Sequence, residues 1–360
     1  MKGRLGIPAV LAVVFVILAV PFAAGGTDAA VGQSYNSQLD DNGIEVYDQL
    51  SKLAGCYSNT AQVSADFGKM VLFDSEDEAK AYGERVAHDA MAAKYYSDPM
   101  IAHLWNIPVV SVPVDVSTAE VTVTAKQQAD VYFIASSVSF QLAVPEEMKD
   151  DPSTETNELA QKMDEVKSAV MKKDFDGQTQ YLVRDVASYL KGIKDIDDED
   201  GKVSNIYDAL ISKKSSSAGV AAAFTAICTF SGVDTITVKG NVFDNDDEPS
   251  TAYWNQVRIG DTWYAVDAVM KNSGYDGYMM AGFSSEVSDG ESVSLFSATH
   301  VADLDMADEN GLVAPQLSRD TFPYPDETPF LQKYGAHIML LIIGLIIVFT
   351  LLHAVKHGNL

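Results

Sequence analysis

Cysteine, histidine and basic residues are scarce in this 360-residue chain. It contains 2 Cys and 6 His, and its 25 Lys and Arg residues stand against 51 Asp and Glu residues, which gives a formal net charge of −26. Two cysteines exclude a disulfide-rich scaffold and a four-cysteine zinc site. The excess of acid argues against nucleic acid as a partner, because phosphate backbones are bound through Lys and Arg.

Two acidic runs resemble calcium loops only in composition. An EF-hand loop has acids at alternating positions, glycine at the sixth position and glutamate at the twelfth. In the run that starts at Asp195 the glycine falls at the seventh position and no glutamate occupies the twelfth, and residues 244–248 also lack the spacing. His88 and His103 show no metal-ligand spacing either. We therefore expect solvated loops, no metal site and no cofactor.

The N-terminal end has the order of a secretory signal. Lys2 and Arg4 precede an apolar run over residues 7–20, and small residues follow at 23–26. Residues 5–24 are also long enough to span a bilayer, so a cleaved signal and an uncleaved anchor both remain open.

The C-terminal end predicts a transmembrane helix. Residues 336–355 contain no Lys, Arg, Asp or Glu, and Lys356 follows. At about 1.5 Å per residue this segment crosses a bilayer core of ~30 Å, whereas the alternative is a buried core helix. Basic residues outside both apolar runs predict cytoplasmic ends and an extracytoplasmic main domain in the cell membrane, in a single-pass or double-pass arrangement.

The middle of the chain mixes helical and strand periodicity. Apolar spacing predicts helices over 44–53, 76–96, from Pro152 onward, over 182–190 and over 217–231. Alternation predicts strands within 109–141, over 233–242, and in a hairpin of 253–259 with 263–267 around Gly260-Asp261. The pattern predicts an α+β fold in which a helix packs on an antiparallel sheet.

One stretch of this pattern resembles the transglutaminase-like superfamily, a branch of the papain-like cysteine enzymes. Its members show Tyr-x-Ala-Leu, Cys-x-Gly-Tyr-Ala-x-Ala-Phe, Cys-x-x-x-Gly, His-Ala-Trp-Asn-x-Val and Trp-Tyr-x-Val-Asp in this order. The residues that match are Tyr207, Ala209, Leu210, Gly219, Ala221, Ala223, Phe224, Cys228, Gly232, Trp254, Asn255, Val257, Trp263, Tyr264, Val266 and Asp267. The resemblance is firm over 183–270 and loose over about 88–300.

The resemblance implies a Cys-His-Asp triad that this chain has largely lost. The nucleophile position is Ser217, the histidine position is Ala252, and only the acid is kept, as Asp267. A serine hydroxyl needs a base within hydrogen-bond reach, and alanine supplies none. The resemblance therefore implies no expected catalytic residue, and these three positions are interpreted as vestigial.

Each of these residues also has a structural interpretation. Ser217 is expected to cap its helix, Asp267 to hold a hydrogen bond at the end of its strand, and His300 to pack rather than act as a base. Tyr253 and Trp254 are candidates for the wall of an old ligand groove, with a place in the core as the alternative. Cys56 and Cys228 pair if the compartment is oxidising, or Cys228 remains a free buried thiol.

These observations predict a membrane-anchored, cell-surface binding module with an inactive transglutaminase-like domain. The expected ligand is a surface peptide, an envelope polymer or a neighbouring protein. One alternative is a serine-variant hydrolase or acyltransferase that uses Ser217 with a base from elsewhere, such as His300 or a lysine. Another is a structural envelope protein without a groove. The expected boundaries are 1–26 for the signal or anchor, 27–150 for an α/β extension, 151–300 for the transglutaminase-like domain, 301–335 for a linker, 336–355 for the membrane helix and 356–360 for the tail.

Overall fold

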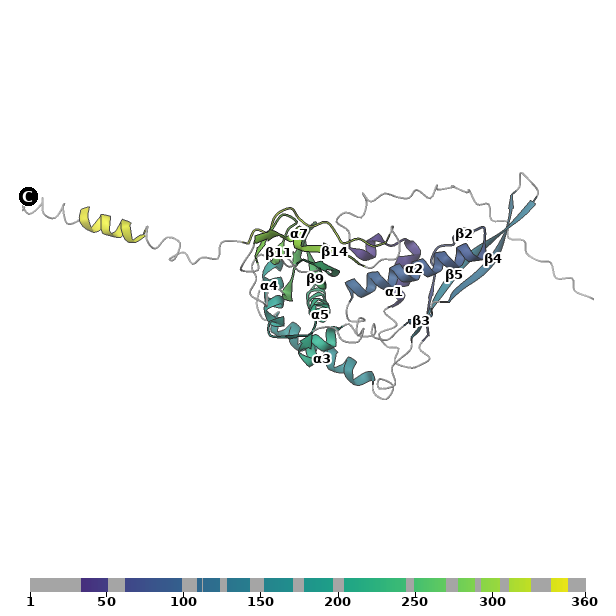
Figure 1. Ribbon diagram of the computed structural model, residues 1–360, viewed down its shortest axis with the longest axis horizontal. Helices are drawn as coiled ribbons and strands as arrows, with labels where there is room; N and C mark the ends of the chain where they lie inside the picture. The colour runs from purple at the N-terminus through teal and green to yellow at the C-terminus, as the bar shows by residue number, and fades with distance from the viewer. Residues whose placement is uncertain are drawn as a thin grey trace, which may run out of the picture. The chain divides into compact units, whose positions relative to one another are not determined.

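The computed structural model describes thirteen stretches of the chain, in two units that span 1–321 and 322–360. The described residues are 34–50, 62–98, 109–111, 113–123, 128–142, 152–170, 178–196, 204–243, 249–269, 278–288, 293–304, 311–324 and 338–348. Helices and antiparallel sheets alternate along the first unit, which confirms the predicted α+β class (Figure 1).

The first part of unit one is a sheet built around one long strand. Strand β5 (Gln128–Leu142) pairs antiparallel with β1 (Gln62–Asp66), β2 (Leu72–Phe73), β3 (Val109–Ser111) and β4 (Val114–Val123). The helices are the short 3₁₀ turn η1 (Tyr35–Gln38), α1 (Asp41–Gln49) and α2 (Glu76–Ser97). Apolar faces of α1, α2 and β5 meet in one cluster that includes Val46, Val86 and Phe140.

Side-chain caps determine where these two helices begin. The Asp40 carboxylate accepts a hydrogen bond from Gly43 N–H at 2.7 Å, and Ser75 accepts one from Glu78 N–H at 3.2 Å. A cap satisfies amides that the first turn leaves without an acceptor. Helix α1 therefore starts at Asp41, ahead of the predicted residue 44.

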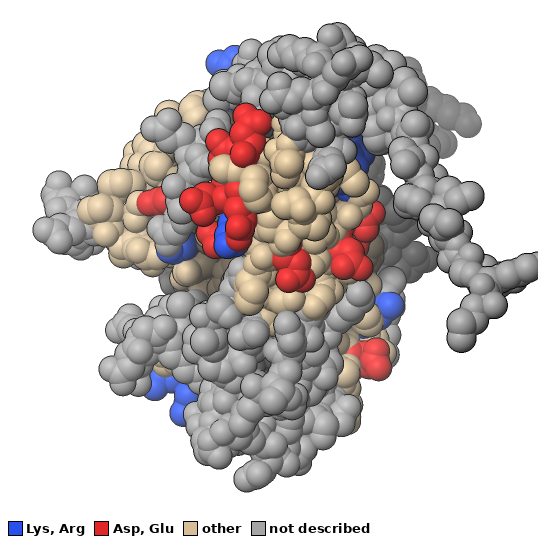
Figure 2. Space-filling view, turned by 90° about the vertical axis from the view of Figure 1, so that its right-hand side faces the viewer, with Lys and Arg blue, Asp and Glu red and all other residues tan. Residues whose placement is uncertain are grey.

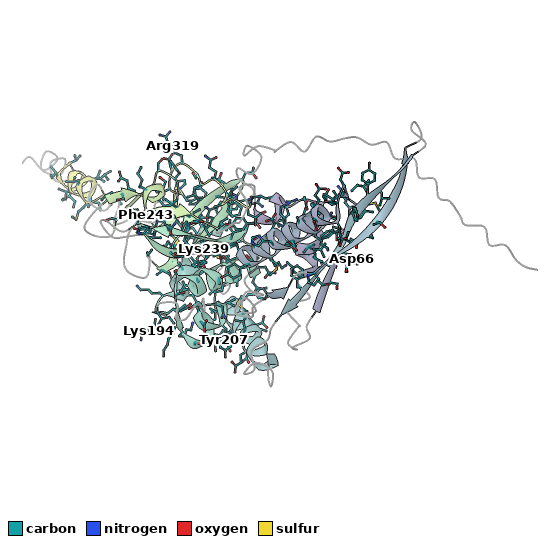
Figure 3. All side chains as sticks on the ribbon, turned by 45° about the vertical axis from the view of Figure 1, so that its right-hand side comes forward. Asp66, Lys194, Tyr207, Lys239, Phe243 and Arg319 are labelled. Atoms are coloured by element: carbon teal, nitrogen blue, oxygen red, sulfur yellow. The ribbon has the colours of Figure 1, made fainter. Side chains whose placement is uncertain are left out.

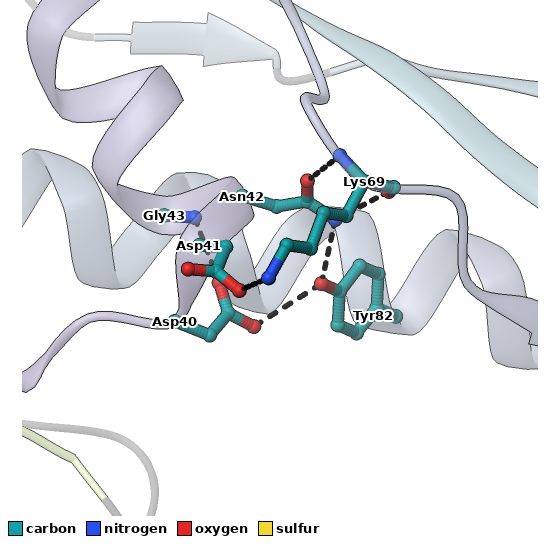
Figure 4. Close-up of polar contacts among 6 residues, drawn as sticks. All are labelled: Asp40, Asp41, Asn42, Gly43, Lys69 and Tyr82. Carbon is teal, nitrogen blue, oxygen red and sulfur yellow. Dashed lines mark hydrogen bonds and ion pairs between the residues drawn. The ribbon is translucent and has the colours of Figure 1, made fainter. Parts of the chain in front are cut away.

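A polar network ties α1 to α2 and to the loop between β1 and β2 (Figure 4). Asn42 donates to Lys69 C=O at 2.9 Å and accepts from Lys69 N–H at 2.7 Å. The Tyr82 hydroxyl accepts from Asn42 at 2.9 Å and donates to the Asp40 carboxylate at 3.1 Å. Burial is the main reason that the pKa of Tyr82 rises to about 12.

The change Tyr82→Phe tests this network. It removes both hydrogen bonds of the hydroxyl, so we expect the free energy of unfolding to fall by about 1–2 kcal/mol at neutral pH. Because the folded-state pKa of Tyr82 lies above that of the unfolded chain, wild type loses this contribution as pH rises from 10 to 12. Urea unfolding at several pH values should therefore show the gap between wild type and variant narrowing over that interval. A gap that widens there would contradict the assignment.

The second part of unit one combines the α-helices α3, α4 and α5 with a five-stranded sheet. The helices are α3 (Pro152–Val170), α4 (Thr179–Leu190) and α5 (Ser217–Phe230), with the π-helical turn η5 (Asp208–Ser212) and the paired segments β6 (Lys194–Asp195) and β7 (Lys214–Ser215) between them. The sheet has the order β11-β10-β9-β8-β14 and consists of β8 (Thr235–Val242), β9 (Ser250–Ile259), β10 (Thr262–Val266), β11 (Met279–Ala281) and β14 (His300–Ala302). A small hairpin of β12 (Glu286–Ser288) and β13 (Val293–Leu295) leads into the short helix α7 (Phe296–Thr299).

The predicted hairpin and the predicted central helix are confirmed. Thr262 pairs with Ile259, so Gly260 and Asp261 form a two-residue turn, and Gly260 has a φ of 62°. A positive φ at the first turn position alone fits a type II′ turn, which glycine adopts without strain. Helix α5 packs on β8 and β9, where Asn255 donates to Ala221 C=O at 2.8 Å.

One core joins the N-terminal helices to this sheet. Tyr35, Ala93 and Tyr96 belong to the same buried cluster as Trp254 and Trp263. The fully buried Tyr35 hydroxyl donates to Thr237 C=O of β8 at 3.2 Å. The span predicted as an extension therefore contributes to the core of the sheet that follows it.

The last residues of unit one lie along the sheet as well. Ser318 N–H donates to Trp263 C=O at 2.7 Å, and Phe283 N–H donates to Ser318 C=O at 2.6 Å. Gln38 donates to Val313 C=O at 2.9 Å and accepts from Val313 N–H at 3.0 Å. Within the predicted linker 301–335, residues 301 and 302 thus belong to β14, and Val313 and Ser318 are hydrogen-bonded to the rest of unit one.

Unit two contains one described helix, over residues 338–348. Its large apolar side chains are broadly exposed, with Leu340 at 68% and Leu341 at 64%. No helix within the described stretches has both the length and the apolar character needed to span a bilayer, and the remainder of 336–355 lies outside those stretches. The N-terminal segment 1–26 also lies outside them.

The described surface reflects the acidic composition. Figure 2 shows acidic groups across one face with fewer basic groups among them, as the net charge of −26 implies. Such a surface repels polyanions.

Candidate functional site

The start of α5 is where the resemblance places the nucleophile. Ser216 is the N-cap residue and makes no side-chain cap hydrogen bond, and Ser217 is the first helical residue. The expectation that Ser217 caps this helix is therefore wrong by one position. A Cβ on Gly219 would stand 2.0 Å from Ser215 Oγ and 2.5 Å from Asn205 C=O, so only glycine fits in this first turn.

The Ser217 hydroxyl is bound to main chain rather than to a base. Its Oγ accepts a hydrogen bond from Tyr253 N–H at 3.2 Å, and the side chain is half-buried. Ala252, the histidine position, pairs with Gly240 of β8 and lies next to Tyr253 on β9. Within the described part of the chain, no hydrogen bond joins Ser217 to a histidine, a carboxylate or a lysine.

Asp267 follows directly after β10 and is almost completely buried, at 2% exposure. Its Oδ1 accepts from Val269 N–H at 2.9 Å, and its own N–H donates to Tyr278 C=O at 2.9 Å. The predicted structural hydrogen bond at the end of this strand is confirmed. Its Oδ2 lies 3.2 Å from Nε2 of His300.

His300 contacts a candidate site residue, which the sequence did not indicate. It begins β14, its side chain is fully buried, and its Nδ1 lies 2.8 Å from Thr299 Oγ1. Its ring stacks on Phe296 at 4.2 Å between centroids and meets Trp254 edge-on at 5.1 Å. It is a packing histidine, as expected, but one that is paired with Asp267, the residue at the acid position of the resemblance. Its position 33 residues after Asp267 matches no family motif, so no sequence signal pointed to this pair.

The partners of His300 determine what the pair can do. One ring nitrogen faces Asp267 and the other faces Thr299, so neither is left to take a proton from Ser217. General-base catalysis needs a nitrogen within about 3 Å of the hydroxyl it deprotonates. In this geometry the histidine–carboxylate pair joins β14 to the end of β10.

Gly240 allows β14 to lie this close. A Cβ at this position would stand 2.2 Å from Val301 C=O, 2.5 Å from the Trp254 ring and 2.9 Å from Ala302 Cα. His300 pairs with Val242 and Ala302 pairs with Gly240, so the glycine lies directly beside the strand that carries the histidine. It is a positioning residue for the buried pair.

The two candidates for a groove wall lie inside the protein. Trp254 is 2% exposed and Tyr253 is 8% exposed, and both belong to the core cluster with Tyr96 of α2. Trp263 is also buried, at 1%, and Tyr264 is partly buried. The N-terminal part of the chain thus supplies side chains beside Tyr253.

The remaining candidates are placed as follows. Cys228 is free and buried, and burial raises its pKa well above the ordinary value of a thiol. His88 is exposed on α2, 3.6 Å from Asp89, whereas Cys56 and His103 lie outside the described residues. Among the described residues no group of three or more His, Cys, Asp or Glu side chains is arranged to hold a metal ion.

Comparison with solved structures gives distant neighbours. No protein-family model matches the chain, and no curated protein matches it. A candidate cysteine protease from Cytophaga hutchinsonii superimposes with a TM-score of 0.25 and 12% identity, over 45% of this chain and 66% of that one. A protein described as a TGase superimposes with a TM-score of 0.25 and 11% identity, over 48% of this chain and 47% of that one. The chain thus spans slightly less than two thirds of the first neighbour and about half of the second, and similarity at this level does not establish a family.

Proposed function

We propose that this chain is a membrane-anchored, extracytoplasmic protein whose transglutaminase-like domain has lost catalysis and serves as a cell-surface binding module. One observation carries the loss of catalysis. The acid at the triad position, Asp267, is hydrogen-bonded to the buried His300, while Ser217 has a main-chain amide as its partner. The class of domain is supported by the spacing of the sequence motifs.

The chemistry of a serine nucleophile supports the same interpretation. A hydroxyl has a much higher pKa than a thiol, so the dipole of α5 alone does not ionise it. Alanine at 252 offers no base, and loss of a triad member costs on the order of 10⁴-fold or more in rate.

The membrane attachment is supported by the two apolar ends. In unit two the described helix 338–348 is apolar on all sides, and Met339, Leu340 and Leu341 are each more than 60% exposed. A helix that is hydrophobic all round needs an apolar surrounding, and a bilayer provides one. The ligand that we propose for the main domain is a peptide, an envelope polymer or a neighbouring protein.

A serine-variant hydrolase is the second candidate, and one observation favours it. Lys239 of β8 pairs directly with Tyr253 of β9, whose amide is hydrogen-bonded to Ser217 (Lys239 is labelled in Figure 3). Directly opposed residues of an antiparallel pair share one face of the sheet. A lysine becomes a general base when its surroundings hold it neutral.

Turnover assays separate the two candidates. We expect no peptide hydrolysis and no glutamine-to-amine transfer above background from the full-length wild type, and the same from Ser217→Ala. Wild-type turnover that Ser217→Ala abolishes would contradict the proposal. If the single change Lys239→Met also abolishes that turnover, Lys239 is identified as the base. The double change Ser217→Cys/Ala252→His restores two triad positions, so activity gained there shows that the scaffold still accepts substrate.

A further inference from the structure

The first turn of α5 holds a buried hydroxyl without a hydrogen-bond partner. Ser216 is 7% exposed, and among the described residues its Oγ has no hydrogen-bond partner and does not cap the helix. A serine side chain at the N-cap lies beside the amides of the first turn. Leaving a buried polar group unpaired is unfavourable, so an occupant that accepts its proton would stabilise the site.

The main-chain amides beside it also lack acceptors. The first intrahelical hydrogen bond runs from Val220 N–H to Ser216 C=O, at 3.2 Å. Across the described stretches of the chain, no group accepts a hydrogen bond from the N–H of Ser217, Ala218 or Gly219. Helix α5 has 14 residues, long enough for its first turn to carry the positive end of a helix dipole.

Ser217 adds a further donor at the edge of this site. Its Oγ lone pair accepts the Tyr253 N–H, so its own hydroxyl proton remains to be donated. The side chain is half-buried, so Ser217 is in part accessible to solvent. No Asp or Glu lies in the first turn of α5, and Lys239 lies opposite Tyr253 on the neighbouring strand.

We infer that the N-terminus of α5 binds a small oxyanion, a carboxylate or phosphate group, through the hydroxyls of Ser216 and Ser217 and the amides of the first turn. The inference rests on the proposed function, because it names the ligand chemistry that the vestigial site accepts. Donors without acceptors at a helix N-terminus favour negative charge. Water is the competing occupant, and it would satisfy Ser216 with no preference for an anion.

Isothermal titration of the full-length chain in detergent, at low and constant ionic strength, tests this inference. The probes are acetate and inorganic phosphate, with chloride as the blank. We expect saturable binding of at least one oxyanion and, because hydrogen bonds to charged groups are strong, a loss of about tenfold or more in affinity for Ser216→Ala and for Ser217→Ala. The ratio of the two affinities distinguishes a carboxylate ligand from a phosphate ligand.

The matched control is Ser231→Ala. Ser231 Oγ is likewise buried and unpartnered, but it lies at the C-terminal end of the same helix, where the dipole is negative. We expect wild-type affinity for this variant.

Absence of saturable binding, or equal affinity in all variants, would overturn the inference and assign the site to water. If Ser216→Ala does not fold, the affinity of Ser217→Ala alone decides the test. The Ser217 side chain is only half-buried, so we expect this variant to fold. The turnover assays on the same preparations are independent of this outcome. If neither binding nor turnover is observed, the proposed oxyanion site is contradicted, whereas the proposed loss of catalysis still holds.

Discussion

Replacing His300 by alanine is expected to lower the free energy of unfolding by about 3–5 kcal/mol, because it removes the contact between the His300 ring and Oδ2 of the buried Asp267 and opens a cavity against Phe296. Asp267 is 2% exposed in the wild type, so the contact that is lost is a buried one. Urea unfolding of the full-length chain, followed by tryptophan fluorescence, measures the change, since Trp254 lies edge-on to the His300 ring.

A double-mutant cycle with Asp267→Ala isolates the pair. Removing both partners should cost less than the sum of the single changes, with a coupling energy of about 1–3 kcal/mol. His88→Ala is the matched control, because His88 is exposed on α2 and should change stability by less than about 0.5 kcal/mol. Additive single changes would show that the two side chains do not interact.

The second large effect is expected for Gly240→Ala. The added Cβ would meet Val301 C=O at 2.2 Å and Ala302 Cα at 2.9 Å, and main chain cannot move aside as a flexible side chain can. Overpacking of this kind costs about 1–3 kcal/mol or more, so we expect a loss at the upper end of that range. We also expect β14 to separate from β8, which weakens the contact between His300 and Asp267.

Gly68→Ala is the control for this change. Its Cβ would stand 2.9 Å from Cγ of Glu45, an exposed side chain that can rotate away. We expect a small effect there. If Gly240→Ala and Gly68→Ala are equally mild in urea unfolding, the close approach of β14 is not what requires the glycine.

The sequence predicted those helices and strands whose type and bounds depend on neighbouring residues. Helix α5 and the hairpin of β9 and β10 carry long apolar runs, strand alternation and a Gly-Asp turn, so their types and approximate bounds follow from neighbouring residues. The start of α1 was misplaced because Asp40 was not recognised as its cap. Strand β14 was missed because it has only three residues, too few to display a period.

The site was predicted only as far as its motif extends. Asp267 was found because it closes a Trp-Tyr-x-Val-Asp segment, and its main-chain hydrogen bond was expected. His300 was not connected to it, because the pairing joins strands from different parts of the chain and depends on the turn into α7. The contact between Asp267 and His300 is therefore decided by tertiary packing, which motif spacing does not encode.

The reciprocal hydrogen bonds between Gln38 and Val313 join points that are 275 residues apart in the sequence. The side-chain amide of Gln38 thus connects the two ends of a span, 38–313, that contains nearly all the described residues of unit one. Tension applied between the flanking segments would fall first on the outer contacts, those of Tyr35 with Thr237 and of Ser318 with Trp263, and then on the hydrogen bonds between Gln38 and Val313. A domain that enters and leaves at one point can also be transplanted into a host chain, or circularly permuted, with little change to its core.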